Sequence, residues 1–290
     1  MSQNLGHITA LHRFPVKSMQ GEALEESWAN ERGLLGDRAW AVVDTATDRI
    51  ASAKQPRLWR RLLECQARFI ESPRSGQALP PVQITTPDGA EYLCDDPAAS
   101  QALSELLGRQ VLLSATAQPA ASYEDYWPDI EHLSPEGFRD QITELPVALM
   151  APEGTFFDFS SFHVITTQAL AALQAAAPGS RIERPRFRPN IELRWGDAPA
   201  GFIENEWRGK TLRMNDLALK VLIPSMRCVM TTLAQGDLPD DNMVLRAVVQ
   251  ANRVDIPNLG KYPCIGVYAS LARKLSSGGL LRVGDSCRLE

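Results

Sequence analysis

Residues 79–93 read Leu-Pro-Pro-Val-Gln-Ile-Thr-Thr-Pro-Asp-Gly-Ala-Glu-Tyr-Leu. Two extended runs flank the triplet Pro87-Asp-Gly89, and proline, aspartate and glycine are the residues that favour tight turns between paired strands. The stretch therefore predicts a strand, a turn and a second strand, which together form a β-hairpin.

Working outward, several other segments have the apolar runs and flanking turn residues that are typical of strands. At the N-terminal end, Ile8, Ala10 and His12 lead into Pro15 and predict a strand. Further strands are predicted over 40–44, 191–195 and 217–223, and over 281–289 as a strand, a Gly-Asp turn and a second strand.

Two helices are predicted among these strands. Ser100 is suited to cap a helix that runs to about Leu107 and ends at Gly108, where a left-handed cap is expected. Thr166 or Thr167 caps a second helix that runs through Ala176 and is stopped by Pro178-Gly179. The sequence thus predicts an α+β, β-dominant fold.

The length of the chain allows one large domain or two modest ones. The chain has 290 residues, 44% of them hydrophobic, and a formal net charge of −5. That charge argues against nucleic acid as a partner, because a phosphate backbone requires a basic face. Apolar periodicity fades between Gln118 and Glu136. We therefore predict domains at 1–118 and 119–290.

Cysteine usage and the absence of membrane segments predict a cytoplasmic protein. There are five cysteines but no C-x-x-C, which argues against zinc ribbons, thioredoxin-type pairs and clustered iron–sulfur ligands. The first residues lack the basic and apolar regions of a signal peptide. The stretch Phe159–Ser180 is too polar to span a membrane.

The standard short nucleotide and hydrolase motifs are missing. No G-x-G-x-x-G follows a strand, and G-x-S-x-G and H-E-x-x-H do not occur. Gly209-Lys-Thr211 imitates the end of a P-loop, but Glu204 stands where the first glycine belongs.

Three short clusters combine charged, polar and turn-forming residues in a way that a purely structural role does not require. They are Phe14–Met19 with Gly36–Trp40, then Arg184–Asn190, then Pro224–Thr232. Taken singly, each is more typical of a solvated loop or of a small core cysteine. Together they predict an anion pocket in which cations lower the pKa of a cysteine thiol. Its members would be Lys17, Ser18, Arg38, Arg188, Asn190 and Cys228.

These clusters belong to a longer series of motifs by which the chain resembles the MOSC-domain family. The motifs are Leu11–Ser18, Arg32–Trp40, Ala53–Leu58, Phe187–Ile191, Trp207–Gly209, Arg227–Thr232 and Leu281–Asp285. The resemblance implies a MOSC N-terminal β-barrel-like domain packed on a MOSC β-barrel domain with a few helices. It is strongest to the bacterial and mitochondrial amidoxime-reducing proteins, which use the molybdenum cofactor, a molybdopterin.

By this resemblance, Cys228 ligates molybdenum, and the other matching positions hold the pterin and its phosphate. The cofactor-binding positions would be Lys17, Ser18, Arg38, Ser160, Arg188, Asn190 and Arg227. Asp158 lies in the segment Asp158-Phe-Ser160, with Thr166 farther on, and is the acid that we expect to deliver protons. Cys65, Cys94, Cys264 and Cys287 are expected to be packing residues.

The chain departs from its relatives at two places. Residues 231–237 read Thr-Thr-Leu-Ala-Gln-Gly-Asp where relatives often have Thr-Thr-Val-Asp-Pro-x-Thr-Gly, so substrate preference does not carry over. Lys54 stands where arginine is frequent, which keeps the charge but loses the guanidinium fork. Tyr126 and Trp127 either line a substrate entrance or make a packing contact at the protein surface.

The resemblance implies an oxidoreductase that reduces N-hydroxylated compounds such as amidoximes, hydroxylamines and N-hydroxylated bases. Some bacterial relatives carry a [2Fe–2S] domain, but this sequence stops at Glu290 without the cysteines for one. Electrons are therefore expected from a separate ferredoxin- or flavoprotein-type donor. The alternative is a sulfur or molybdenum-cofactor carrier with a persulfide on Cys228. A third reading, a barrel whose site has decayed, fits the intact set of motifs poorly.

Overall fold

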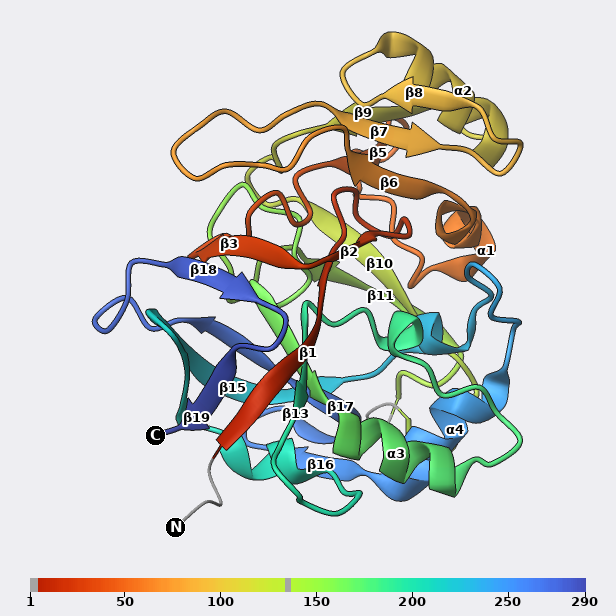
Figure 1. The fold of residues 1–290 in the computed structure, drawn as a ribbon. Helices are drawn as coiled ribbons and strands as arrows, with labels where there is room; N and C mark the ends of the chain where they lie inside the picture. Colours follow the sequence, from red (N-terminus) through yellow and green to blue (C-terminus); the bar gives the residue numbers. More distant parts are fainter. Residues whose placement is uncertain (1–4, 134–136) are drawn as a thin grey trace.

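The centre of the protein is a closed barrel of seven strands (Figure 1). The structure is a computed structural model that describes residues 5–133 and 137–290. The barrel strands pair in a row that starts with β12 and ends with β17, and these two strands also pair with each other, which closes the barrel. In spatial order the strands are β12 (Phe162–Thr166), β13 (Ile191–Arg194), β1 (Leu5–Arg13), β19 (Ser286–Leu289), β14 (Thr211–Met214), β15 (Leu217–Met226) and β17 (Gly260–Leu271).

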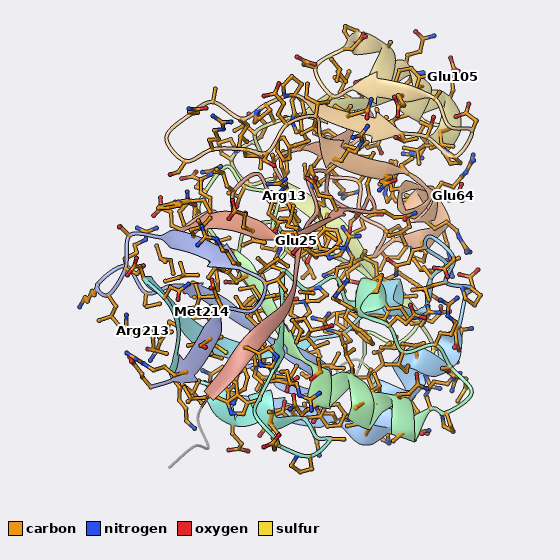
Figure 2. All side chains as sticks on the ribbon, in the orientation of Figure 1. Arg13, Glu25, Glu64, Glu105, Arg213 and Met214 are labelled. Carbon is orange, nitrogen blue, oxygen red and sulfur yellow. The ribbon has the colours of Figure 1, made fainter. Side chains whose placement is uncertain are left out.

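Apolar side chains fill the barrel interior. Ile8, Leu193 and Met214 are completely buried there, whereas Glu64 and Glu105 lie on the outer surface of the N-terminal part (Figure 2). The barrel closes tightly at Gly266, which has a φ of +76°. A Cβ atom at this position would lie 2.6 Å from the backbone oxygen of the β12 residue Val164, so the strands approach closely only with glycine.

The N-terminal part, drawn at the top of Figure 1, contains two small sheets and the helices α1 (Pro56–Trp59) and α2 (Pro97–Leu107). The hairpin predicted at 79–93 is confirmed, with β7 (Val82–Thr85) paired to β8 (Glu91–Leu93). The β-dominant α+β class is also confirmed. The other elements of this part are β5 (Ala41–Asp44), β9 (Val111–Ser114) and β6 (Gln66–Phe69).

The helix α2 begins earlier than the sequence suggested. Asp96, not Ser100, is its N-cap and accepts a hydrogen bond from Ala98 N. Ser100 lies inside the helix, where its hydroxyl accepts a hydrogen bond from the backbone of Leu113. The prediction of a Ser100 cap was wrong because Pro97 already supplies a first-turn residue with a fixed φ. The predicted end at Gly108 is confirmed by its left-handed conformation.

The second predicted helix is confirmed as α3 (Thr167–Ala176), and Thr166 is its cap. It packs against α4 (Asn242–Ala251), which the sequence analysis did not identify (Figure 1). None of the described helices has both the length and the apolar composition needed to cross a membrane.

The C-terminal strands form where they were predicted, but they do not pair with each other. β18 (Gly279–Arg282) pairs with β3 (Glu26–Asn30), whereas β19 enters the barrel. The remaining short strands are β2 (Glu22–Leu24), β4 (Gly33–Leu34) and β16 (Arg253–Ile256). As a result, the N-terminal segment and the C-terminus share both the barrel and a three-stranded sheet.

The stretch 118–136, interpreted as a boundary or surface crossing, contains a strand. β10 (Ser122–Trp127) pairs along its length with β11 (Gln141–Pro146). Residues 134–136 lie outside the described residues. This strand was not evident from the sequence because the buried face of β10 carries Tyr123 and Asp125, so it lacks the apolar alternation of an ordinary strand; the domain boundary itself stays a prediction.

Candidate functional site

One pocket brings together all nine predicted site residues. They are Lys17, Ser18, Arg38, Asp158, Ser160, Arg188, Asn190, Arg227 and Cys228. Most of these residues lie in three loops: the loop after β1, the loop before β12 and the loop before β13. The three loops meet because β1 is antiparallel to β13, and β13 is parallel to β12. Cys228 reaches the same place from β15, since β17 pairs with both β15 and β12.

Three of the predicted residues have a left-handed backbone. The φ angles are +64° for Ser18, +48° for Arg38 and +53° for Arg188. This conformation is unfavourable for residues other than glycine, by about 1–2 kcal/mol each. Such strain persists where the surroundings impose it, and it concentrates at functional sites. At Arg188 the turn Arg184–Phe187 leads directly into the left-handed residue.

The carboxylate of Asp37 organises one side of the pocket. It forms an ion pair with Arg38 and accepts hydrogen bonds of 2.8 Å from the backbone of Phe14 and from Asn190 Nδ2. Asn190 Oδ1 accepts a further bond from His163 N. Since both ends of the Asn190 amide bond to protein groups, this residue joins the loops rather than offering its amide to a ligand.

Two guanidinium groups stack on the ring of Phe14. The Cζ atoms of Arg38 and Arg188 lie 4.6 and 4.0 Å from the ring centroid. Arg188 is only 9% exposed, and within the described part of the chain neither of its Nη atoms has a hydrogen-bond partner. Burial and the nearby Arg38 lower the pKa of Arg188 to about 9. A buried cation without a partner is unfavourable, so this group suits a bound anion.

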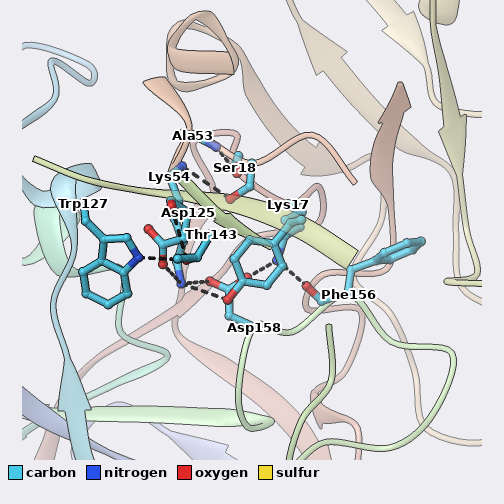
Figure 3. Close-up of polar contacts among 11 residues, drawn as sticks. Lys17, Ser18, Ala53, Lys54, Asp125, Trp127, Thr143, Phe156 and Asp158 are labelled. Atoms are coloured by element: carbon cyan, nitrogen blue, oxygen red, sulfur yellow. Dashed lines mark hydrogen bonds and ion pairs between the residues drawn. The ribbon is translucent and has the colours of Figure 1, made fainter. Parts of the chain in front are cut away.

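Asp158 links two lysines of the pocket (Figure 3). Lys17 pairs with Asp158 and donates a 2.8 Å hydrogen bond to Phe156 O, and Lys54 Nζ lies 3.3 Å from Asp158 Oδ2. Burial acts to raise the pKa of Asp158, but the attraction of Lys17 and Lys54 outweighs burial and holds this pKa well below its usual range. A carboxylate held ionised is a poor proton donor, which disfavours the predicted acid role.

The thiol of Cys228 is less acidic than the sequence suggested. Burial raises its pKa to about 11, although the charges of Lys54 and Arg227 act in the opposite direction. Nearby cations do act to lower this pKa, as expected, but desolvation of the thiolate exceeds their attraction, so the net shift is upward. Cys228 is partly exposed, whereas the other four cysteines are buried and free, as expected of packing residues.

Two further predicted residues act mainly within the protein. The guanidinium of Arg227 donates to the backbone oxygens of Ser225 and Phe187, at 3.1 and 3.0 Å. The hydroxyl of Ser160 donates a 2.6 Å bond to Ala269 O. These contacts fix the loops around Cys228, and they leave the cofactor-binding role of both residues a prediction.

Sequence reasoning missed three contributors to the site. Asp37 lies within a quoted motif but received no role, and Lys54 was noted only as a replacement for arginine. Asp125 lies in β10, a strand that was not predicted because its segment lacks a regular pattern of apolar residues. The residues considered for an entrance, Tyr126 and Trp127, do not border the pocket, and Trp127 Nε1 donates instead to Thr143 Oγ1 (Figure 3).

Two family models match the chain. The model of the MOSC N-terminal beta barrel domain matches residues 5–110, and that of the MOSC domain matches residues 152–288. The chain belongs to the MOSC-domain family. MOSC domains are associated in general with molybdenum-cofactor binding. Neither match covers 111–151, so β10 and β11 of this MOSC protein lie between them.

Comparison with solved structures gives distant likenesses to this MOSC protein. The YuaD protein from Bacillus subtilis has 10% identity and a TM-score of 0.46, over 98% of this chain and 95% of that chain. YiiM from Geobacillus stearothermophilus has 12% identity and a TM-score of 0.30, over 45% of this chain and 54% of that chain. A search of the curated proteins gave no match.

The residues of this MOSC pocket fit an anionic metal cofactor. Arg188 offers two Nη atoms without a protein partner, and Cys228 offers a free thiol. Among the described residues, no three His, Cys, Asp or Glu side chains gather to hold a metal ion. A metal at Cys228 would therefore take its other ligands from a cofactor, as a pterin dithiolene provides.

Proposed function

We propose that this MOSC protein is a molybdenum-cofactor-dependent reductase of N-hydroxylated compounds. The observation that carries the proposal is the gathering of cationic side chains around one free thiol. Lys17, Lys54, Arg38 and Arg188 border the same pocket as Cys228. Cations bind the phosphate of a pterin, and a cysteine thiolate is a soft ligand suited to molybdenum.

In this proposal, Cys228 ligates the metal, while Arg38 and Arg188 bind the anionic part of the cofactor. Asp37 and Phe14 hold the two guanidinium groups in place. When bound, the cofactor supplies two-electron redox chemistry at the metal. Because the pKa of Cys228 is raised to about 11, formation of the metal–thiolate bond displaces a proton from the thiol.

The overall reaction consumes two electrons and two protons. For an amidoxime, R–C(NH2)=NOH gains both and yields the amidine R–C(NH2)=NH and water. The N–O bond breaks, nitrogen is reduced, and oxygen leaves as water. The electrons come from a separate ferredoxin- or flavoprotein-type protein. Water or a cationic side chain in the pocket is a better proton source than the ionised Asp158.

The alternative function is a carrier of sulfur or of the cofactor, with a persulfide on Cys228. A persulfide needs one reactive cysteine but no group of cations suited to phosphate. The raised pKa of Cys228 also disfavours a reactive thiolate in the protein without cofactor. Both observations support the reductase over a persulfide carrier.

Metal content tests the proposal directly. The wild type, Cys228→Ala and Cys94→Ala would be expressed in a host that makes molybdenum cofactor. Cys94 is buried in the N-terminal core, away from the pocket, and serves as the control. We expect stoichiometric molybdenum and pterin in wild type and control, and lost or labile molybdenum in Cys228→Ala. Amidoxime reduction with an artificial electron donor would follow.

Two results would overturn parts of the proposal. Full metal retention and activity in Cys228→Ala would exclude Cys228 as the metal ligand. A folded wild-type protein that holds no molybdenum would favour the carrier, and mass spectrometry would then show whether Cys228 carries a persulfide.

A further inference from the structure

The two lysines in the pocket differ in how their ammonium groups are held. Lys17 donates a 2.8 Å hydrogen bond to Phe156 O and pairs closely with Asp158, so both contacts fix its position (Figure 3). Lys54 donates a 3.2 Å hydrogen bond to Tyr123 Oη. Charge-assisted bonds are usually 2.7–2.9 Å long, so even this contact is loose.

The other neighbours of Lys54 are two carboxylates at ion-pair distance. Its Nζ atom lies 3.3 Å from Asp158 Oδ2 and 3.4 Å from Asp125 Oδ2. An ammonium has three N–H donors. Three acceptors, from Tyr123, Asp125 and Asp158, lie within 3.4 Å of the Lys54 ammonium, which is held in the pocket wall by contacts longer than the hydrogen bond of Lys17.

The hairpin that follows the N-terminal family match builds this arrangement. The backbone N–H of Tyr126 in β10 donates a 3.0 Å hydrogen bond to Lys54 O. The Tyr123 ring lies under the ammonium, with its centroid 4.8 Å from Nζ. Asp125 is 3% exposed, and its Oδ1 has no hydrogen-bond partner among the described residues. Lys54 is thus the cation that compensates this buried carboxylate.

We propose that Lys54 binds the hydroxyl oxygen of the N-hydroxylated substrate, and that Asp125 and Tyr123 are the residues that position it. The inference rests on the proposed function, since Lys54 borders the same pocket as Cys228. As the N–O bond breaks, negative charge develops on the departing oxygen. A partly exposed ammonium that borders the pocket stabilises that charge, as preorganised donors do in other enzymes.

In this proposal, some cations of the pocket are assigned to the cofactor and one to the substrate. Arg38 and Arg188 share the Phe14 ring and suit the cofactor phosphate. Lys54 instead lies 3.3 Å from Asp158 Oδ2, and we assign it to the substrate. Residues 122–146, which neither family match covers, then shape the substrate side of the pocket.

The test uses the holoprotein with benzamidoxime as substrate and a reduced viologen as donor. The variants are Lys54→Met, Lys54→Arg, Tyr123→Phe and the double variant Lys54→Met/Asp125→Asn, which avoids leaving Asp125 buried without its cation. Lys210→Met, at an exposed lysine, is the control. Molybdenum and pterin content are measured first. The binding of benzamidoxime is then compared with that of benzamidine, which lacks the oxygen.

We expect every variant to hold the wild-type amount of molybdenum and pterin. Removal of the ammonium should lower kcat by about 100-fold, the effect of losing one donor to a developing oxyanion. Lys54→Arg should restore at least a tenth of the wild-type rate, and Tyr123→Phe should lower it less than Lys54→Met. Binding of benzamidoxime should weaken in Lys54→Met, with benzamidine binding unchanged.

The outcomes separate this inference from the proposed function. Loss of molybdenum from both Lys54→Met and the double variant would place Lys54 in the cofactor site and overturn the inference alone. Wild-type kcat and benzamidoxime binding in those variants would also overturn it. If the wild type itself holds no molybdenum, the proposed function fails, and this inference fails with it.

Discussion

The carboxylate of Asp37 accepts a 2.8 Å hydrogen bond from Nδ2 of Asn190, which lies 153 positions later in the chain. Asp37 also forms an ion pair with Arg38, and Asn190 is two residues after Arg188. This contact therefore ties together the two loops whose guanidinium groups stack on Phe14. The spacing of the two cations depends on it.

Replacement of Asp37 by alanine should destabilise the protein. Its carboxylate is buried and has three partners, and removal of one member of a buried ion pair costs about 3–5 kcal/mol. The free energy of unfolding in urea would measure this loss. Arg282→Ala is the control, because Arg282 and Glu26 form an exposed pair worth about 1 kcal/mol or less. Equal losses in the two variants would contradict the role of Asp37.

Arg188→Met should stabilise the protein without cofactor while weakening anion binding. Both Nη atoms of Arg188 are buried without partners, and relief of an unsatisfied buried group is worth about 1–3 kcal/mol. Inorganic phosphate should raise the thermal midpoint of the wild type, because a ligand bound to the folded state stabilises it, and raise that of the variant much less. Arg184→Met, in the same turn but nearer the surface, is the matched control. An equal phosphate response in Arg188→Met and wild type would count against an anion site at Arg188.

Asp158→Asn should lower stability by removing the carboxylate that faces Lys17 and Lys54. Two nearly buried ammonium groups would then repel each other, at a cost of about 3 kcal/mol by analogy with other broken buried pairs. Urea unfolding measures the change. The control is Asp140→Asn, since Asp140 and Arg57 are both exposed and 3.8 Å apart. An effect no larger than that of the control would show that Asp158 does not hold the lysines.

The barrel should lose stability as pH rises through the range set by Glu204. This carboxyl is fully buried beneath Thr166 and Gly266, and burial raises its pKa to about 7. The pKa of Glu204 is about 4.5 in the unfolded chain and about 7 in the folded protein. At a pH between these two values, the Glu204 carboxyl is protonated in the folded state but ionised in the unfolded state. Stability therefore falls with rising pH across this window, by about 3 kcal/mol in total.

Glu204→Gln isolates this effect, because glutamine keeps the shape of the side chain and does not titrate. The difference in unfolding free energy between wild type and variant, measured from pH 4 to pH 8, should favour the wild type most at low pH. A constant difference across this range would show that Glu204 does not titrate there.

Local signals in the sequence predicted a good part of this fold. The Pro-Asp-Gly turn, the Thr166 cap and the left-handed Gly108 each act over a few residues, so neighbouring side chains suffice to specify them. The predictions failed where a distant contact decided the outcome. β10 presents Asp125 to Lys54 on its inner face, and an inward carboxylate is acceptable there only because a lysine from another segment compensates it.

The sequence by itself singled out nine candidate site residues, and all nine border one pocket. Only the tertiary structure decided what each of them does. Desolvation and pairing depend on neighbours remote in the chain, and these made Asp158 an ionised clamp and Cys228 a weakly acidic thiol. They also left Arg188 without a protein partner, while Asn190 became a bridge between loops. Residue type fixes the chemistry available, and burial fixes which charge state each group adopts.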